Sequence, residues 1–185
     1  MRPKHLAITL SKLTPHPCSK LELEQYVTEG DLASYWMLGV NETDDLLDQR
    51  VLDLGAGNGV LGIACLHLGA AHVTFVEADE EAVDVLRQNI ASLNQDLRQR
   101  TTVIHAHLGA EDFTPPNVDI VVTNPPWGTQ TAKADRPLLE SAFSTTARAV
   151  HVLHHVKARH LGAMGKAAGW DYEHVLRTEF RLPAQ

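Results

Sequence analysis

Short apolar runs alternate with amphipathic segments along most of the chain, and glycine or proline often marks the boundary between them. Compact runs rich in valine, isoleucine and leucine predict strands at 51–54, 73–76, 102–107, 118–123, 150–153 and 174–182. Apolar residues at helical spacing predict a helix that begins at Ser19 and others at about 31–38, 60–68, 80–93, 137–148 and 157–168. Strands that alternate with helices build βαβ units, so we expect an α/β fold with a mainly parallel twisted sheet and helices on both faces. Ligands of such sheets bind at the carboxyl ends of the strands.

Length and composition fit one globular domain. The chain has 185 residues, of which 44% are hydrophobic, enough for a sizeable core and too many for a disordered chain. We predict a basic N-terminal tail over residues 1–20 and a single domain over residues 21–185. No apolar run is long enough to span a membrane, and no secretory signal is evident. Cys18 and Cys65 lack zinc-ligand spacing, and two thiols do not make a disulfide framework. We therefore expect a cytoplasmic protein.

Charge is unevenly distributed. The formal net charge is -7, and residues 21–128 hold 4 Lys/Arg against 18 Asp/Glu. This balance excludes a strongly basic protein that grips nucleic acid through phosphates alone. Any contacts with nucleic acid are expected from the basic N-terminal residues and from the last third of the chain. Charge by itself favours the simpler interpretation that these residues keep the surface soluble.

The first candidate site is a glycine loop. The segment VLDLGAGNG places Gly55, Gly57 and Gly59 directly after a predicted strand and before a predicted helix. Glycine there permits a tight turn and lets a ligand approach the backbone. Position 60 is valine, so the third glycine of the G-x-G-x-x-G pattern of nicotinamide enzymes is missing.

Two acids accompany this loop. Asp53 stands at the end of the first strand and Glu77 at the end of the next. One carboxylate can pair with an ammonium group and the other can accept both hydroxyls of a ribose, a combination that suits S-adenosylmethionine better than a pyrophosphate. The alternative is that both acids cap helices or are solvated.

A second candidate site is the segment Asn124-Pro125-Pro126-Trp127, which follows a predicted strand. The two prolines fix their own φ angles and restrict the residues before them, so the loop is stiff. The Asn124 side chain and the Pro125 carbonyl can accept both hydrogens of an amino group, while Trp127 can stack on a planar base. This arrangement favours methyl transfer to nitrogen by positioning, without a general base at the start. The alternative is a structural turn with a buried tryptophan.

These motifs resemble a known family. DLGAGNG (53–59) followed by NPPW looks like the class I methyltransferases that modify amino or amide nitrogens. LEQYVT (23–28) and NPPWGTQ (124–130) resemble LEQYPT and NPPFGTK of the small-subunit ribosomal RNA adenine-N6 methyltransferases of archaea and eukaryotes. AVHVLHH (149–155) and LRTEFRLPA (176–184) are similar to their AVYSLHK and LRYDLPA.

The resemblance implies a Rossmann-like class I fold, S-adenosylmethionine as cofactor and an adenine in structured RNA as methyl acceptor. The cofactor would be held by residues that close over its methionine end, line it or hold its ribose: Gln25, Tyr26, Thr28, Asp53, Gly55, Gly57, Glu77 and Asn124. The target adenine would be held by Asn124, Pro125, Pro126 and Trp127.

The sequence departs from the family at three places. His107, followed by Leu108, stands where the family has an acid that meets the cofactor's adenine. Trp127 replaces phenylalanine. The family continues into a further strand beyond the position of Gln185, so either the sheet lacks its last strand or the chain is shortened.

Protein partners are also expected. The family that the chain resembles works with a small zinc-binding activator. The strand Thr102–His107 is expected at a sheet edge and carries no charged residue or proline, so nothing guards it against pairing with another chain. We therefore expect such an activator to pair there.

The chain has 11 histidines, but His151, His154, His155 and His160 do not form a zinc motif, and no metal site is predicted. Lys133 and Asp135 either order a substrate-gating loop or lie exposed. Three other functions stay open: glutamine-N5 methylation of a protein, a non-catalytic RNA-binding or ribosome-assembly module, and a nicotinamide oxidoreductase.

Overall fold

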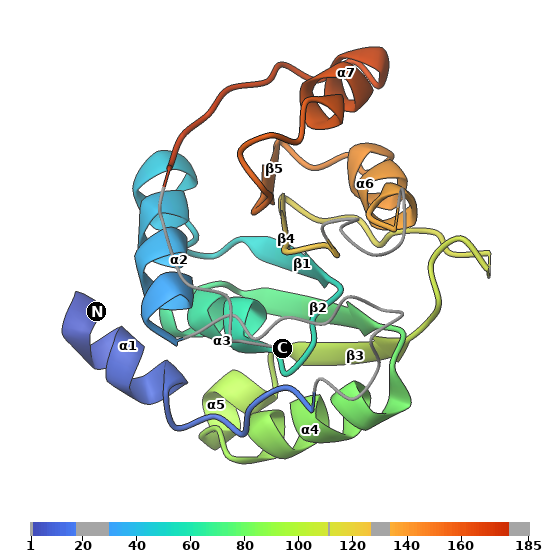
Figure 1. Ribbon diagram of the computed structural model, residues 1–185. Coiled ribbons are helices and arrows are strands. Elements are labelled where there is room, and N and C mark those ends of the chain that lie inside the picture. The colour runs from blue at the N-terminus through green and yellow to red at the C-terminus, as the bar shows by residue number, and fades with distance from the viewer. Residues whose placement is uncertain (1, 18–29, 111, 127–133, 178–185) are drawn as a thin grey trace.

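The computed structural model describes residues 2–17, 30–110, 112–126 and 134–177 (Figure 1). Within them five strands form one parallel sheet in the order β3-β2-β1-β4-β5. The strands are β1 (Arg50–Leu54), β2 (His72–Glu77), β3 (Thr101–His105), β4 (Ile120–Thr123) and β5 (Ala149–Val152). The predicted α/β fold with a parallel sheet is therefore confirmed.

Helices cover both faces of this sheet. They are α1 (Pro3–Leu10), α2 (Gly30–Asp44), α3 (Val60–His67), α4 (Glu80–Ala91), α5 (Gln95–Arg98), α6 (Arg136–Phe143) and α7 (His160–Ala167). Figure 1 shows α4 and α5 beside β3, and α6 and α7 at the opposite end beside β5.

Alternate residues of each strand face two separate hydrophobic clusters, as the period of two in a strand requires. Val51 and Phe75 join the larger cluster, which also contains Trp36 of α2. Leu52 and Val76 join the smaller cluster, under α6. Because both faces are covered, the central strands read as continuous apolar runs, which is typical of parallel sheets.

The expected segments agree with the structure apart from their ends. The helix expected over 31–38 continues to Asp44, and α6 ends at Phe143 rather than 148. β3 ends at His105, two residues before the expected end. Residues 174–177 of the strand expected at 174–182 are not in a strand, and the rest of that segment, like the helix expected from Ser19, lies outside the described residues.

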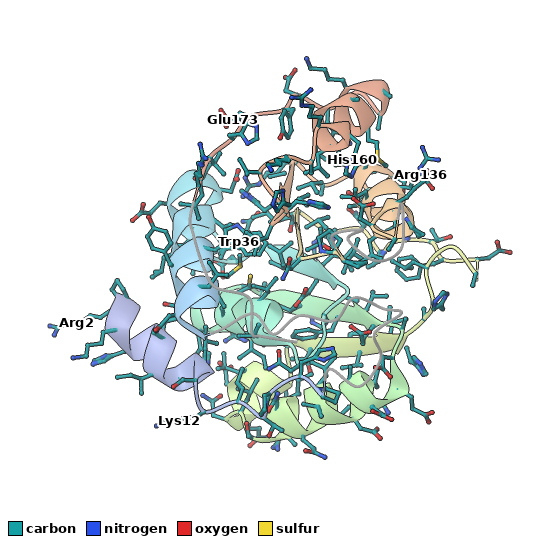
Figure 2. All side chains as sticks on the ribbon, viewed as in Figure 1. Arg2, Lys12, Trp36, Arg136, His160 and Glu173 are labelled. Atoms are coloured by element: carbon teal, nitrogen blue, oxygen red, sulfur yellow. The ribbon has the colours of Figure 1, made fainter. Side chains whose placement is uncertain are left out.

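The first residues differ from the basic tail expected over 1–20. Leu6 and Leu10, one helical turn apart on α1, are buried in the larger cluster. A Cβ on Gly30, the first residue of α2, would lie 3.0 Å from the backbone nitrogen of Ser11, so the two helices approach closely only because this residue is glycine. Arg2 and Lys12 project outward, whereas Trp36 points into the interior (Figure 2). The boundary at residue 20 therefore needs correction, because α1 packs as part of the domain.

In the part of the chain that the structure describes, no helix has the length and apolar character that crossing a membrane requires.

Candidate active site at the carboxyl ends of the strands

The sheet register brings the two predicted motifs together. Leu54, the last residue of β1, pairs with Val76 of β2 and with Thr123 of β4. The residues that follow these three are Gly55, Glu77 and Asn124. The glycine loop, its acid Glu77 and the first residue of the segment Asn124-Pro125-Pro126-Trp127, here called the acceptor motif, therefore leave the sheet side by side. This edge is where a parallel sheet binds its ligands.

The glycine loop makes the tight turn that the sequence predicts. Gly55, Gly57 and Gly59 have φ angles of 67°, 54° and 86°, in the left-handed region that favours glycine. A Cβ on Gly59 would lie 2.4 Å from Leu86 Cδ1, so any other residue there would have to displace the Leu86 side chain as well as adopt a left-handed backbone. The backbone nitrogens of Gly55 and Ala56 both donate to the Val76 carbonyl, which fixes the loop to the end of β2.

Asp53 is completely buried beneath this loop. Its Oδ2 accepts a hydrogen bond from the Gly62 backbone nitrogen at 2.9 Å, whereas its Oδ1 has no hydrogen-bond partner among the described residues. Burial raises the pKa of Asp53 to about 7, the Gly62 hydrogen bond opposes the rise, and the nearby Glu77 carboxylate adds to it. An orphaned buried carboxylate oxygen is costly, and a cationic ligand group would relieve it. Asp53 therefore fits the ammonium end of S-adenosylmethionine.

Glu77 is 8% exposed and organises the loop through backbone donors. Its Oε2 accepts from the Gly57 nitrogen at 2.7 Å, and its Oε1 accepts from the nitrogens of Ala78 and Asp79 at 2.9 Å. An ionised carboxylate has about four acceptor positions, so Glu77 can also accept from ribose hydroxyls. The alternative in which Asp53 and Glu77 are solvated is wrong, because both are buried. The alternative in which they cap helices holds for Asp53, since it accepts from Gly62 in the first turn of α3.

Asn124 directly follows Thr123, the residue at which β4 is hydrogen-bonded both to β1 and to the residue after β5. The Thr123 hydroxyl donates to the Leu54 carbonyl at 2.7 Å, and the Thr123 carbonyl accepts from the Leu153 nitrogen at 3.0 Å. Pro125 is buried and Asn124 half-buried. The start of the acceptor motif is therefore held between the glycine loop and the end of β5.

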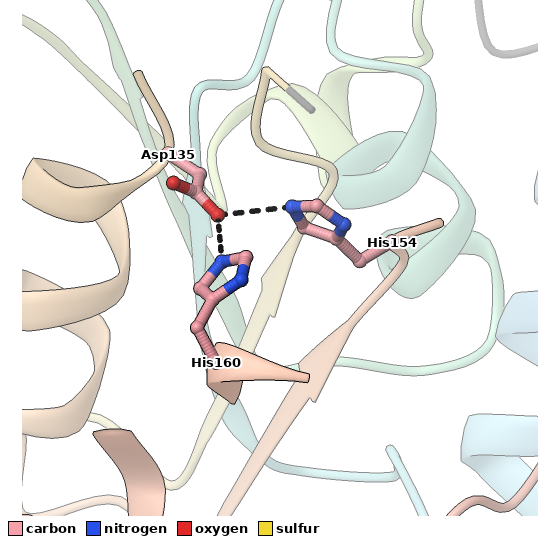
Figure 3. Close-up of side chains that lie close together, drawn as sticks. All are labelled: Asp135, His154 and His160. Atoms are coloured by element: carbon pink, nitrogen blue, oxygen red, sulfur yellow. Dashed lines mark hydrogen bonds and ion pairs between the residues drawn. The ribbon is translucent and has the colours of Figure 1, made fainter. Parts of the chain in front are cut away.

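Sequence reasoning did not foresee how the residues after this motif are held. The Asp135 carboxylate accepts through Oδ2 from Nε2 of His154 at 3.0 Å and from Nε2 of His160 at 2.5 Å (Figure 3). The side chains of Asp135 and His154 are 5% and 3% exposed, and that of His160 is 46% exposed. Of the two open interpretations of Asp135, the exposed loop is wrong, since this residue is buried.

A second feature that sequence reasoning missed lies across the glycine loop. The amide of the buried Asn89 accepts from the Thr14 nitrogen at 2.8 Å and donates to the Thr14 carbonyl at 3.0 Å, while Asn58 also donates to that carbonyl at 3.0 Å. These hydrogen bonds bring His16 so close that a Cβ on Gly57 would lie 2.7 Å from its Cδ2. The N-terminal segment thus covers the loop.

The remaining predicted site residues are divided. Gln25, Tyr26, Thr28 and Trp127 lie outside the described residues. His107 is exposed just beyond β3, whereas Leu108 is buried in the smaller hydrophobic cluster.

Comparisons with known proteins agree over most of the chain. Residues 37–170 match the family model described as Conserved hypothetical protein 95. The chain is 32% identical to the rRNA N(6)-adenosine-methyltransferase METTL5 of Danio rerio, over 100% of this chain and 89% of that protein. Identity to Mettl5 of Drosophila melanogaster is 33% over 88% of this chain and 76% of that protein. The crystal structure of PH1948 from Pyrococcus horikoshii aligns with a TM-score of 0.78 and 38% identity, covering 91% of this chain and 82% of that one.

The parallel sheet, the glycine loop and the two acids at its edge define a class I methyltransferase with S-adenosylmethionine as its cofactor. The full-length identity is specific enough to go further. The chain belongs to the family of the METTL5 rRNA N6-adenosine methyltransferases. This membership excludes the nicotinamide oxidoreductase that the glycine loop alone left open.

Proposed function

We propose that the protein transfers a methyl group from S-adenosylmethionine to the exocyclic N6 of an adenine in structured RNA, with small-subunit rRNA as its substrate. The observation that carries this proposal is the register of β1, β2 and β4, which sets Asn124 beside Gly55 and Glu77. Membership of a family whose relatives carry the name rRNA N6-adenosine methyltransferase supports the choice of acceptor.

Asp53, Gly55, Gly57 and Glu77 form the part of the proposed cofactor site that the structure describes. When bound, S-adenosylmethionine supplies an electrophilic methyl group on a positively charged sulfur. Asp53 would pair with the cofactor ammonium, because its orphaned Oδ1 is buried. Glu77 would accept from the ribose, while its three backbone hydrogen bonds keep the loop in shape.

Other cofactor contacts come from the family resemblance. Gln25, Tyr26 and Thr28 would close over the methionine end, in a segment that follows the anchored residue Thr14 along the chain. His107 and Leu108 would lie toward the cofactor's adenine. The exposure of His107 suits a contact with a ligand, whereas the burial of Leu108 restricts it to backbone contacts.

Asn124 and Pro125 would orient the acceptor. The Asn124 side chain and the Pro125 carbonyl accept the two hydrogens of the adenine amino group, so that the nitrogen lone pair, otherwise delocalised into the ring, points at the methyl group. Pro126 stiffens this loop and Trp127 stacks on the base. Such a base must be unpaired or flipped out of its helix, because Trp127 can stack only on a base that has left its own stack. The amino group loses its proton after transfer, when it has become acidic enough to release it to water.

We further propose that a small zinc-binding activator pairs with β3. This strand lies at the sheet edge, and Val103 and Ile104 are only half-buried there. Residues 101–108 contain no charged side chain or proline that would discourage pairing. A partner at this edge could also supply RNA contacts that the acidic surface of residues 21–128 lacks. The cytoplasm is the proposed location.

The backbone of β3 supports this choice. The backbone N–H and C=O groups of its even-numbered residues face β2. The Arg100 carbonyl accepts from the Val73 nitrogen, and the Ala106 nitrogen donates to the backbone carbonyl of Glu77. Because backbone groups alternate along a strand, Val103 directs its N–H and C=O away from β2, where another strand can bind them.

The proposed function is tested by methyl transfer from radiolabelled S-adenosylmethionine to ribosomal subunits, free RNA and protein release factors in parallel. We expect label in small-subunit RNA, and mass spectrometry of nucleosides should identify it as N6-methyladenosine. Label on a protein glutamine would replace this function with the amide-methylating alternative. Absence of label on every acceptor, with or without the activator, would favour a non-catalytic RNA-binding module.

A further inference from the structure

Asp135 occupies a helix start without capping it. It is the residue before α6, yet its carboxylate makes no capping hydrogen bond. Aspartate at this position ordinarily accepts an N–H of the first helical turn. Here the buried carboxylate points instead at the imidazoles of His154 and His160 (Figure 3). Its main interaction is therefore with the end of β5 and the start of α7, rather than with its own helix.

The hydrogen bonds of His154 define its tautomer. Its Nδ1 accepts from the backbone nitrogen of His155 at 2.8 Å, so the proton of the neutral ring is on Nε2. That Nε2 donates to Asp135 at 3.0 Å. Burial lowers the pKa of His154 and so favours the neutral ring, while the hydrogen bond to Asp135 acts in the opposite direction. The pair is thus a directed hydrogen bond between a buried imidazole and a buried carboxylate.

Neighbouring residues at the end of β5 hold both ends of the acceptor segment, residues 124–135. At its start, the Leu153 nitrogen donates to the carbonyl of Thr123, the residue before Asn124. At its end, His154 donates to Asp135. The two attachment points, Leu153 and His154, are consecutive residues just after β5, so we expect a change at one to shift the other.

We propose that Asp135 and His154 are a positioning pair that anchors Asp135 to the residues directly after β5, where Leu153 also holds Thr123, so that Asn124 meets the target amino group at the correct height above the sheet. The inference rests on the proposed function, because it concerns the same acceptor loop. His160 is the second donor to Asp135 and keeps its carboxylate satisfied from the solvent side.

The same three residues could be taken for a metal site. Their ligand atoms lie within 4.8 Å of one another, and a carboxylate with two imidazoles is a donor set for zinc or iron. A metal-bound histidine, however, normally donates its second ring N–H to an acceptor. His154 instead accepts at Nδ1 and carries its proton on the nitrogen that faces Asp135. This arrangement favours the hydrogen-bonded pair over a metal centre.

Kinetics of His154 variants test the pair. In His154→Ala we expect kcat for RNA methylation to fall about ten- to hundredfold, as misplacement of reacting groups by about 1 Å does. The KM for RNA and the cofactor affinity should stay within about twofold. His154→Gln, which retains an N–H donor, should recover much of the loss, and His160→Ala should lose less than His154→Ala. Full activity of a folded His154→Ala protein would overturn the proposal.

Two measurements decide the question even if RNA is not the acceptor. Hydrogen exchange of amides in residues 124–135 should become faster in His154→Ala, with β1 and β2 unchanged, and nitrogen NMR should show the Nε2-protonated ring. If the wild type methylates no RNA, the proposed function fails while these readouts still test the pair. Unchanged exchange would contradict it. So would one equivalent of zinc retained after dialysis, with His154→Ala unable to retain it.

Discussion

The two halves of the site are built by different means. On the cofactor side, between β1 and β2, the acids are held by backbone N–H groups: Gly62 for Asp53, and Gly57, Ala78 and Asp79 for Glu77. On the acceptor side, between β4 and β5, Asp135 is held by the side chains of His154 and His160. The cofactor side therefore depends on the turn geometry of one loop, and the acceptor side on the packing of three separate elements.

This difference separates binding from turnover. A loop held by its own backbone keeps its shape when a side chain is changed, so substitutions there should alter affinity for the cofactor. A segment held by side chains of other elements loses its position when one of those side chains is removed, so substitutions there should lower the rate of methyl transfer. Among the described residues, the two sides meet at β1, at the hydrogen bond from Thr123 to Leu54, and where Leu138 of α6 lies close to Gly55. Each of the following substitutions tests whether their effects stay separate.

Asn124→Ala should have the largest effect. It removes one acceptor of the target amino group and leaves Asp53 and Glu77 in place. We expect kcat to fall by about a hundredfold or more, the loss typical of one preorganised polar group in an active site. Calorimetry should find nearly unchanged affinity for S-adenosylmethionine, since losing the cofactor contact that the resemblance implies for Asn124 leaves those of Asp53 and Glu77. Full activity of this variant would make the proline loop structural, and a parallel loss of cofactor affinity would remove the distinction between the two sides.

Asp53→Asn should have the next largest effect and the opposite character. The amide retains an oxygen for the Gly62 N–H but loses the charge that pairs with the cofactor ammonium, so affinity should fall about tenfold or more. Thermal shift without and with S-adenosylmethionine measures both stability and binding. Asn124→Ala serves as the matched control, because it should retain the cofactor-dependent shift.

The same substitution should stabilise the free protein in a pH-dependent way. The pKa of Asp53 is about 7 in the folded protein and 3.8 ordinarily, so the folded state binds the proton more tightly than the unfolded state does. The wild type therefore loses stability relative to Asp53→Asn as pH rises from about 4 to about 7. At about 1.4 kcal/mol per pH unit, the difference approaches about 4 kcal/mol at most. Chemical denaturation at pH 5 and pH 8 measures the difference in unfolding free energy between the wild type and Asp53→Asn. An equal difference at the two pH values would show that Asp53 is ionised without penalty.

The same contrast explains what the sequence could predict. The strand periodicity, the turn at Gly55 and Gly57, and the acids at strand ends follow from local patterns, so the fold and the cofactor side were predictable. Asp135 and His160 are 25 residues apart, and the packing of α6 against α7 brings them together. The packing of the N-terminal segment could not be predicted from the sequence, because Leu6 and Leu10 make only a short apolar stripe. Basic residues around that stripe concealed it, and the contact between Thr14 and Asn89 spans 75 residues.

Val103→Pro should have a smaller effect, at the far edge of the cofactor side. Lysine at Val103 or Ile104 would be a poor test, because these side chains pack against the larger and the smaller cluster respectively. Proline at Val103 removes only the N–H that faces away from β2, so it should weaken the complex with the activator about tenfold. Val103→Ala is the matched control, because it loses the packing and keeps the N–H. Full activity of a well-behaved monomer without any partner would contradict the proposed edge pairing.

Asn89→Ala should have the smallest effect and tests whether the N-terminal segment belongs to the cofactor side. The substitution removes the two hydrogen bonds to Thr14 and the one to the Asn58 carbonyl, all made by a buried amide. The segment that carries His16 over Gly57 should then loosen. Because Gln25 follows along the chain, we expect cofactor affinity to fall about three- to tenfold, equivalent to about 1 kcal/mol, with little change in kcat at saturation. Isothermal titration calorimetry and single-turnover kinetics measure the two quantities, and the exposed Asn117, replaced by alanine, is the control. If Asn89→Ala lowers the melting temperature yet binds the cofactor as the wild type does, the contact is structural only. A lower kcat at unchanged affinity would instead assign the segment to the acceptor side.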